Sequence, residues 1–334
     1  MLHNSEKDFI KRHIGPSEDD QSKMLKKLNY KSLDDLINST VPEKIQFKGE
    51  LNIGESNSEY EALRKLKAIS KKNEIYSNFI GMGYYGTYTP YVILRNILEN
   101  PGWYTSYTPY QPEVAQGRLE MLLNFQQMIV DFTGMDIANA SLLDEGTAAA
   151  EAMGLSYRLD KSDSNLVFVS ENCHPQTVEV IKTRAEPMGL KVLVGNEDKV
   201  LEQLKEDIVC GILQYPGTLG DIKDPSEAIS KIHKKNGKAI LACDLLALAK
   251  LKTPRELGAD IAVGSSQRFG IPMGYGGPHA AFFATKDEYK RSMPGRIVGV
   301  SVDRHGNKAY RLSLQTREQH CLLYTSDAAD DVEC

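Results

Sequence analysis

The chain has 334 residues, of which 41% are hydrophobic, and its 40 basic and 45 acidic side chains give a net charge of −5. This length and apolar content suffice for one large domain with a substantial core. The near balance of charge argues against a nucleic-acid-binding protein. No apolar run is long enough to cross a bilayer, and the polar N-terminus MLHNSEKDF lacks the hydrophobic segment of a signal peptide.

The C-terminal segment 321–334 reads CLLYTSDAADDVEC and shows no helical or strand period. It resembles the translation of a sequencing-library adapter, so we expect a non-native tail; the alternative is a divergent natural C-terminus. Without the acidic side chains of this tail, the balance is 40 basic against 41 acidic residues. Two of the five cysteines also lie in it. The remaining cysteines are widely spaced and form no CxxC motif, which indicates neither a disulfide framework nor a metal site.

The first part of the chain is predicted to consist of helices and linkers. Ser17-Glu-Asp-Asp20 is a capping-box sequence before apolar residues at helical spacing. Further helices are expected at 32–36 and 60–69 and, with Pro90 in the first turn, through Leu98, whereas 43–57 is polar and aperiodic. We assign residues 1–100 to a helical N-terminal arm and linker.

From residue 101 onward, short apolar strands alternate with helices. Strands are expected at 166–169, 191–194, 208–214, 239–243, 261–263 and 279–284, and helices at 112–132, 147–157, 176–185, 200–204 and 226–235. Short buried strands separated by helices predict an α/β domain with a mostly parallel sheet covered on both faces. We assign residues 101–320 to this large domain.

Two strand ends carry polar side chains of a known type. The strand at 239–243 leads into Asp244, and the strand at 261–263 leads through Ser265 to Arg268. This arrangement is similar to the aspartate-aminotransferase class (fold type I) of pyridoxal-phosphate (PLP) enzymes. Those enzymes place an Asp at the first strand end, against the pyridine nitrogen, and the Schiff-base lysine after the second. Arg268 stands about where that lysine would be, and arginine stays protonated, so it is no amine nucleophile.

Arg268 therefore has two possible roles. It can bind a carboxylate or phosphate as a bidentate donor, or it can form a structural ion pair, which we favour because the nucleophile is gone. Gly146 and Thr147 lie where a loop enters a helix, a place that favours a phosphate; the alternative we favour is that Thr147 caps the helix. His174 either stacks on a cofactor ring or caps the following helix. We disfavour a Cys173–His174 nucleophile, because neighbours in sequence usually point apart.

Gly81-Met-Gly83-Tyr-Tyr-Gly86 matches the G-x-G-x-x-G pattern of dinucleotide-binding folds. That fingerprint requires a strand before it, a helix opening on it and an acid about twenty residues later. Here a charged helix precedes the glycines and Thr87-Tyr-Thr-Pro90 follows them. An NAD-linked oxidoreductase is thus only a minor alternative.

The segment 107–113 is the strongest candidate for a functional loop. Two tyrosines, two prolines and an amide can present rigid polar groups to a cleft. The alternative is that the tyrosines pack half-buried at a domain junction. The candidate residues are Tyr107, Thr108, Tyr110, Gln111 and Glu113.

Several long, ungapped segments closely resemble the glycine cleavage system P-protein (glycine decarboxylase). They are 12–16, 107–120, 139–152, 264–270 and 293–299, within a resemblance that extends from about Phe9 to His320. The resemblance implies two homologous PLP-fold halves, of which the C-terminal half carries the lysine, and this chain looks like the N-terminal half. It also implies a vestigial cofactor pocket and a glycine channel reached by the loop of Tyr84 and by segment 107–113. The pocket residues would be Gly146, Thr147, His174, Asp244 and Arg268.

The resemblance implies a function for the whole enzyme, a glycine dehydrogenase (aminomethyl-transferring). With PLP bound by its C-terminal half, it would decarboxylate glycine and pass the aminomethyl group to the lipoylated H-protein, as a dimer of full chains. This chain would supply scaffold, interface and channel wall, with no catalytic residue, covalent cofactor or metal of its own. The alternative is an autonomous non-catalytic scaffold or regulatory subunit. Because the N-terminus runs almost directly into the family-like RHIGP, we expect no transit peptide and a cytoplasmic, prokaryotic protein.

Overall fold

The structure is a computed structural model that describes residues 15–49, 51–54, 57–104, 109, 111–273 and 278–313. It divides into two compact units, Met1–Ser77 and Asn78–Cys334. The division falls earlier in the chain than the expected boundary after residue 100, which stays a prediction. The segment 321–334 lies outside the described residues.

The first unit contains the helices that the capping signals predict. They are α2 (Glu18–Lys27), α3 (Leu33–Thr40) and α4 (Glu59–Ser70), with a short 3-10 turn, η1 (Glu43–Ile45), in the segment expected to be a loop. At α2, the Ser17 hydroxyl accepts a hydrogen bond from the Asp20 amide at 3.3 Å, and the Asp20 carboxylate accepts from the Ser17 amide at 3.2 Å. None of these helices has a buried residue, so the described residues of this unit form no core of their own.

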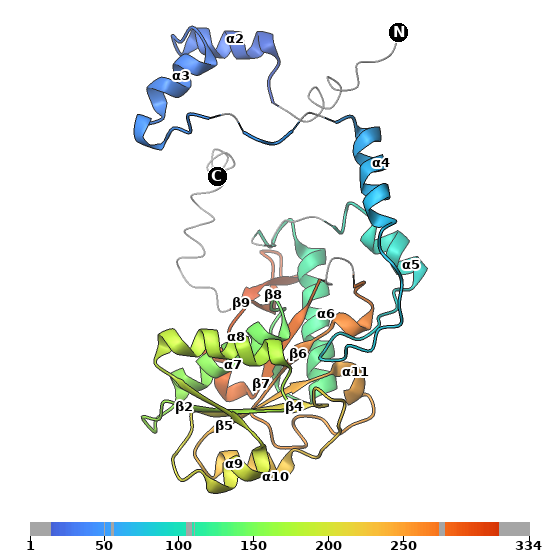
Figure 1. The fold of residues 1–334 in the computed structure, drawn as a ribbon, viewed down its shortest axis with the longest axis vertical. Coiled ribbons are helices and arrows are strands. Elements are labelled where there is room, and N and C mark those ends of the chain that lie inside the picture. Colours follow the sequence, from blue (N-terminus) through green and yellow to red (C-terminus); the bar gives the residue numbers. More distant parts are fainter. Residues whose placement is uncertain are drawn as a thin grey trace. The chain divides into compact units, whose positions relative to one another are not determined.

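The second unit is built on a seven-stranded sheet with strand order β1-β7-β6-β5-β4-β2-β3 (Figure 1). The strands are β1 (Ile137–Ala138), β2 (Leu166–Ser170), β3 (Lys191–Gly195), β4 (Cys210–Tyr215), β5 (Lys238–Cys243), β6 (Ile261–Ser265) and β7 (Ala281–Thr285). Strands β2 to β6 pair in parallel, whereas β7 runs antiparallel to β6 and β1. The expected mostly parallel sheet is confirmed. The short β1 and the separate hairpin of β8 (Ile297–Val302) and β9 (Lys308–Ser313) were not predicted.

Helices cover both faces of the sheet, as the alternation of buried residues along β5 shows. Ala239, Leu241 and Cys243 belong to the core cluster that contains α10 residues, whereas Ile240 and Ala242 belong to the cluster of α7 and α8. Figure 1 shows α7 and α8 on one side of the strands and α9 and α10 on the other. The remaining elements are α5 (Tyr91–Ile93), η2 (Leu94–Leu98), α6 (Gln116–Thr133), α7 (Glu145–Leu159), α8 (Pro175–Ala185), η3 (Glu186–Met188), α9 (Glu197–Gln203), α10 (Ser226–His233), α11 (Leu245–Leu248), η4 (Gln267–Phe269) and η6 (Asp287–Ser292).

Two helix starts differ from the expectation. Pro90 precedes the first helical residue, Tyr91, as the N-cap instead of lying within the first turn, because its carbonyl accepts from the amides of Ile93 and Leu94. Helix α6 begins only at Gln116, after a turn in which the Ala115 amide bonds to the Pro112 carbonyl. Proline at 112 is followed by a turn before the apolar helical pattern begins.

The parallel strands end at one edge of the sheet, and the loops that follow them hold the candidate site. Strand β2 is followed by His174, β5 by Asp244 and β6 by Arg268. In open α/β sheets, this carboxyl edge is where ligands bind.

Candidate functional site

Asp244 and Arg268 form an ion pair at the ends of neighbouring strands. Asp244 follows β5 and caps the short helix α11 by accepting a hydrogen bond from the Leu246 amide at 3.1 Å. Its other carboxylate oxygen, Oδ2, accepts from Arg268 Nη1 at 2.5 Å. The side chains are 12% and 30% exposed, respectively. Of the two roles predicted for Arg268, the structure shows it in an ion pair within the chain.

Tyr85 completes the surroundings of this pair. The Arg268 guanidinium carbon lies 4.7 Å from the centre of the Tyr85 ring, a cation–π contact. Burial raises the pKa of Tyr85, and the nearby Asp244 charge raises it further. The phenol is therefore neutral and offers its ring face to the guanidinium. Arg268 is held on one side by a carboxylate and on another by an aromatic ring.

The cavity beside the ion pair is small. It has a volume of about 20 Å³ and is lined by Tyr85, Glu145, His174, Gln214, Asp244 and Arg268, among others. Such a volume accommodates about one water molecule. Two buried atoms that line it, Gln214 Oε1 and Arg268 Nε, have no hydrogen-bond partner in the described part of the chain. A single bridging water would satisfy polar atoms of this kind.

The start of α7 is capped by a carboxylate. Asp144 Oδ1 accepts a hydrogen bond from the Thr147 amide at 2.7 Å. Asp144 is therefore the cap, and the expectation that Thr147 caps this helix is wrong. Asp is a preferred N-cap residue, so Asp144, just before the helix, was a capping signal in the sequence. Because a negative side chain already occupies the positive end of the helix, a phosphate there would meet like charge.

Glu145, next to this cap, was not predicted as a site residue. Burial raises the pKa of Glu145 to about 7, and the neighbouring Asp244 and Asp144 charges add to the rise. Its Oε1 accepts a hydrogen bond from Thr177 Oγ1 at 3.3 Å. A carboxyl group with a pKa near neutrality is uncommon, and strongly shifted pKa values cluster in functional clefts.

His174 is only 3% exposed and forms part of the same wall. It occupies the N-cap position of α8, but its side chain makes no capping hydrogen bond. Instead its Nδ1 lies 3.1 Å from Thr218 Oγ1. Burial lowers the pKa of His174 to about 4, so the ring is neutral. The adjacent Cys173 is also buried, and burial raises the pKa of its thiol far above the usual value. Because the thiolate is the nucleophilic form, this argues against a Cys173–His174 nucleophile.

A second cavity, of about 140 Å³, adjoins the first between the starts of α7 and α8. Tyr84 and Gly146 both line it, together with His174. Tyr84 meets His279 edge to face, with ring centres 6.1 Å apart. Gly146 is buried where an added Cβ would lie 3.2 Å from Val180, so this glycine allows α7 and α8 to pack closely.

The loop Gly81–Gly86 lacks the context of a dinucleotide site. Gly81 and Tyr84 pair in an isolated bridge. The described residues just before the loop form no strand, and the next helix begins only at Tyr91. The fingerprint needs both elements. The loop instead delivers Gly83 and Tyr85 to the wall of the small cavity.

The predicted loop 107–113 is only partly covered by the structure. Tyr107, Thr108 and Tyr110 lie outside the described residues. Gln111 is half-buried and Glu113 is exposed, just before α6. Neither is among the residues that line the two cavities.

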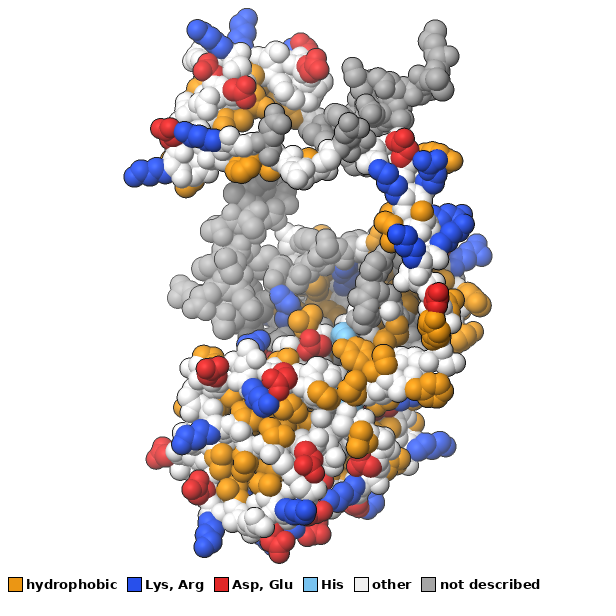
Figure 2. Space-filling model, viewed as in Figure 1, with side chains coloured by type: hydrophobic (Ala, Val, Ile, Leu, Met, Phe, Trp, Pro, Cys, Tyr) orange, Lys and Arg blue, Asp and Glu red, His pale blue; other side chains and the backbone are white. Residues whose placement is uncertain are grey.

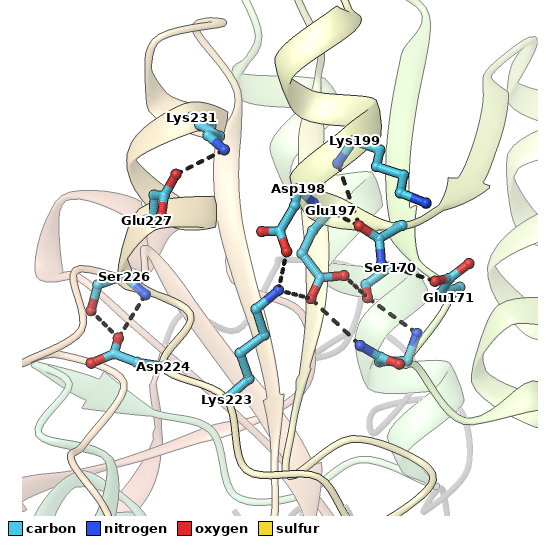
Figure 3. A network of polar contacts seen from close by, with 12 residues as sticks. Ser170, Glu171, Glu197, Asp198, Lys199, Lys223, Asp224, Ser226, Glu227 and Lys231 are labelled. Atoms are coloured by element: carbon cyan, nitrogen blue, oxygen red, sulfur yellow. Dashed lines mark hydrogen bonds and ion pairs between the residues drawn. The ribbon is translucent and has the colours of Figure 1, made fainter.

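A network of hydrogen bonds and ion pairs connects loops at the carboxyl edge of the sheet (Figure 3). Lys223, in the loop after β4, donates to Glu197 Oε1 at 3.3 Å and to Asp198 Oδ2 at 2.5 Å, at the start of α9. Ser170, at the end of β2, donates to Glu197 Oε2 at 2.8 Å. The network ties together three loops, one of which carries Thr218, the partner of His174. The network thereby supports the loop of Thr218, which contacts His174 in the wall of the small cavity.

Two classes of site are absent from the part of the chain that is described. No group of three or more His, Cys, Asp or Glu side chains there is arranged to hold a metal ion. No helix among those residues is both long and apolar enough to cross a membrane.

The fold and the carboxyl-edge site define the class: the second unit has the aspartate-aminotransferase-like α/β fold (fold type I). A sphingosine-1-phosphate lyase from Burkholderia pseudomallei shares it, with a TM-score of 0.57 at 13% identity over 86% of this chain and 72% of that one. The family model described as "Glycine cleavage system P-protein" matches residues 11–324. The chain belongs to this family.

Individual relatives support the same family assignment. A glycine dehydrogenase (decarboxylating) from Pelagibacter ubique (strain HTCC1062) is 84% identical over 320 residues, which cover 96% of this chain and 33% of the relative. The inhibitor-bound crystal structure of a glycine decarboxylase (P-protein) matches with a TM-score of 0.83 and 34% identity, over 91% of this chain and 70% of that one. The chain thus spans about a third of the length of the curated relatives it matches.

The residues at the carboxyl edge do not fit PLP, the cofactor of the fold class. Arg268, which follows β6, is paired with Asp244, which follows β5, and a guanidinium cannot form a Schiff base. The cavity of about 20 Å³ has room for about one water molecule and none for a cofactor. The carboxylate of Asp144 takes the helix amide that would otherwise face a phosphate.

Proposed function

We propose that this chain is the non-catalytic N-terminal half of a glycine decarboxylase and serves as scaffold, interface and channel wall for a lysine-bearing second half. The Arg268–Asp244 ion pair carries this proposal, because it uses both side-chain positions on which PLP chemistry in this fold depends. A guanidinium cannot form a Schiff base. The chemistry must then reside elsewhere in a longer protein.

In this proposal the whole enzyme decarboxylates glycine with PLP bound by its C-terminal half. It then transfers the aminomethyl group to the lipoylated H-protein, and it acts as a dimer of full chains in the bacterial cytoplasm. The names of the relatives, glycine dehydrogenase (decarboxylating), support the reaction. Their length, about three times the matched region, supports a second half.

Exposed apolar side chains support a large partner surface. In the second unit, Phe79 is 92% exposed and Tyr91 is 80% exposed. Ile80, Tyr88, Val92, Ile93, Ile97 and Leu98 are exposed in the same stretch. Figure 2 shows apolar side chains gathered on the side of this unit where α5 lies in Figure 1. A contiguous apolar surface marks a protein interface, and we assign this one to the remainder of the enzyme.

The channel wall is the remaining part of the proposal. Tyr84 lines the larger cavity at the carboxyl edge together with Gly146 and His174, which supports its proposed role as a channel residue. The proposed vestigial pocket consists of Gly146, Thr147, His174, Asp244 and Arg268. Tyr107, Thr108, Tyr110, Gln111 and Glu113 are proposed to reach the glycine site of the second half. Their assignment rests on the sequence.

Cofactor labelling tests the proposal. The chain is incubated with PLP and reduced with borohydride, and labelled lysines are mapped by peptide mass spectrometry, with an aspartate aminotransferase as positive control. We expect scattered, substoichiometric labelling of surface lysines. Stoichiometric labelling of one lysine, with a PLP absorbance band that the D244N variant abolishes, would show a working pocket and overturn the proposal.

The alternative of an autonomous scaffold or regulatory subunit makes a different prediction. Joined to a lysine-bearing second half, the chain should support glycine–CO2 exchange, and the second half alone should not. Equal exchange by the second half with and without this chain would favour the autonomous alternative.

A further inference from the structure

A pocket that the proposed function leaves unused lies at the other edge of the sheet. It has a volume of about 540 Å³, and Lys238, the first residue of β5, lines it. Asp244 directly follows the same strand, so about 20 Å of extended chain separates the two positions. This pocket is therefore distinct from the Arg268–Asp244 cavity. Its volume falls within the range of about 300–1,000 Å³ that is typical of small-molecule sites.

Lys238 is half-buried in the wall of this pocket and has no anionic partner among the described residues. Its ammonium lies 4.9 Å from the centre of the Tyr289 ring. No carboxylate or other acceptor of the described residues bonds to this ammonium. An ammonium has three donors, and a ring face satisfies the charge without accepting those hydrogen bonds in the usual geometry. The ammonium is thus available to an anionic group of a ligand.

The rest of the lining supplies the opposite charge. Asp160 caps the C-terminal end of α7, where the helix dipole is negative. Asp207 and Glu288 are exposed and also line the pocket, as does Lys161. Within the described part of the chain, Asp160 and Asp207 accept hydrogen bonds from the neutral donors Ser162 and Asn236 and form no ion pair, so both carboxylates keep their charge. The pocket offers ammonium groups and carboxylates together.

We propose that this pocket binds a small zwitterion of amino-acid to dipeptide size. The ligand carboxylate pairs with Lys238, and the ligand ammonium lies toward Asp160, Asp207 and the end of α7. A plain anion would meet three carboxylates, and a plain cation would meet two ammonium groups. A molecule that carries both charges matches both sets. The inference does not depend on the proposed function, because it uses residues at the opposite edge of the sheet.

Three matched ligands test the charge requirement without changing the protein. Binding of glycylglycine, N-acetylglycylglycine and glycylglycinamide to the full chain is measured by saturation-transfer NMR and calorimetry. We expect saturable binding of glycylglycine and at least about 10-fold weaker binding of each capped analogue, since each lacks one charge-assisted contact. Absence of saturable glycylglycine binding, or equal binding of all three ligands, overturns the proposal.

A variant pair locates the site. Lys238→Met keeps the length and apolar stem of the side chain and should weaken glycylglycine by about 10-fold or more. Lys250→Met, at an exposed lysine outside the pocket, should leave the Kd unchanged. Thermal melting of both variants checks that they fold. Binding that is unchanged in folded K238M would place the ligand elsewhere and would overturn the assignment.

Discussion

Arg268 Nη1 lies 2.5 Å from Asp244 Oδ2, and the two residues follow strands β5 and β6, which are neighbours in the sheet. A catalytic lysine at this place must be free of such a partner to react with a cofactor. Arginine instead forms a lasting ion pair, because its planar guanidinium matches the geometry of a carboxylate and stays protonated. Arg268 therefore makes a structural contact between two strand ends.

The coupling between these two side chains should be measurable. D244N and R268M should each destabilise the chain by about 1–2 kcal/mol, less than for a fully buried pair because Arg268 is 30% exposed. In the double variant the losses should not add, since both remove the same interaction. Urea unfolding of the four proteins measures the coupling. The exposed pair Lys290–Asp287 is the control, with an expected coupling below about 0.5 kcal/mol. Additive losses at Asp244 and Arg268 would contradict the ion pair.

Glu145 should make stability depend on pH. Its pKa is raised to about 7 in the folded chain, so the folded state holds a proton that the unfolded state releases above about pH 4.5. The favourable contribution is complete below the unfolded pKa and is lost as the pH rises through about 7. E145Q is neutral at every pH. Between about pH 5 and pH 8, its free energy of unfolding should therefore rise relative to that of the parent by about 2 kcal/mol.

The measurement for Glu145 is the difference in unfolding free energy between parent and variant at each pH. A difference is needed because His174, with its pKa lowered to about 4, has the opposite dependence: its contribution is lost as the pH falls from about 6.5 toward 4. E206Q, at an exposed glutamate, is the control. A parent-minus-E145Q difference that stays flat across this range would show that Glu145 is ionised like an exposed acid.

Two glycines of the loop after residue 80 should respond differently to alanine. Gly83 has φ +86°, and an added Cβ would lie 3.1 Å from the His174 ring. G83A should destabilise the chain by about 1–2 kcal/mol, through left-handed strain and contact with a buried ring. Gly86 has no positive φ and nothing within 4 Å of an added Cβ, so G86A should be neutral or slightly stabilising. Thermal and urea unfolding compare them, and equal effects would refute the close approach of Gly83 to His174.

The tyrosines of segment 107–113 test the proposed channel. In the whole enzyme, Tyr107→Phe and Tyr110→Phe each remove one hydroxyl and keep the ring. If the hydroxyl contacts glycine, each variant should lose about tenfold in turnover, equivalent to about 1–3 kcal/mol. Glycine–CO2 exchange is the assay, and unfolding midpoints show whether stability also changes. Parent-like exchange in both variants would remove this segment from the channel and leave the chain a scaffold.

The order of helices and strands was readable from the sequence because short-range signals encode it. The Ser17–Asp20 capping box and the apolar strand before Asp244 each involve a few neighbouring residues, and each appears in the structure where it was predicted. That Arg268 cannot form a Schiff base was readable for the same reason, since the residue type alone decides this. The short strand β1 escaped prediction because two residues carry no periodicity.

Tertiary structure decided what the site residues do. The partner of Arg268 is 24 residues away, and its aromatic neighbour, Tyr85, comes from a loop before α5. The raised pKa of Glu145 and the small volume of the cavity depend on burial by several segments at once. Long-range contacts and desolvation are properties of the packed chain, and no window of neighbouring residues contains them. The sequence by itself determined the family and the presence of Arg268, which cannot form a Schiff base. Packing determined that Arg268 pairs with Asp244 beside a small cavity, because their contact joins two segments that are distant in the sequence.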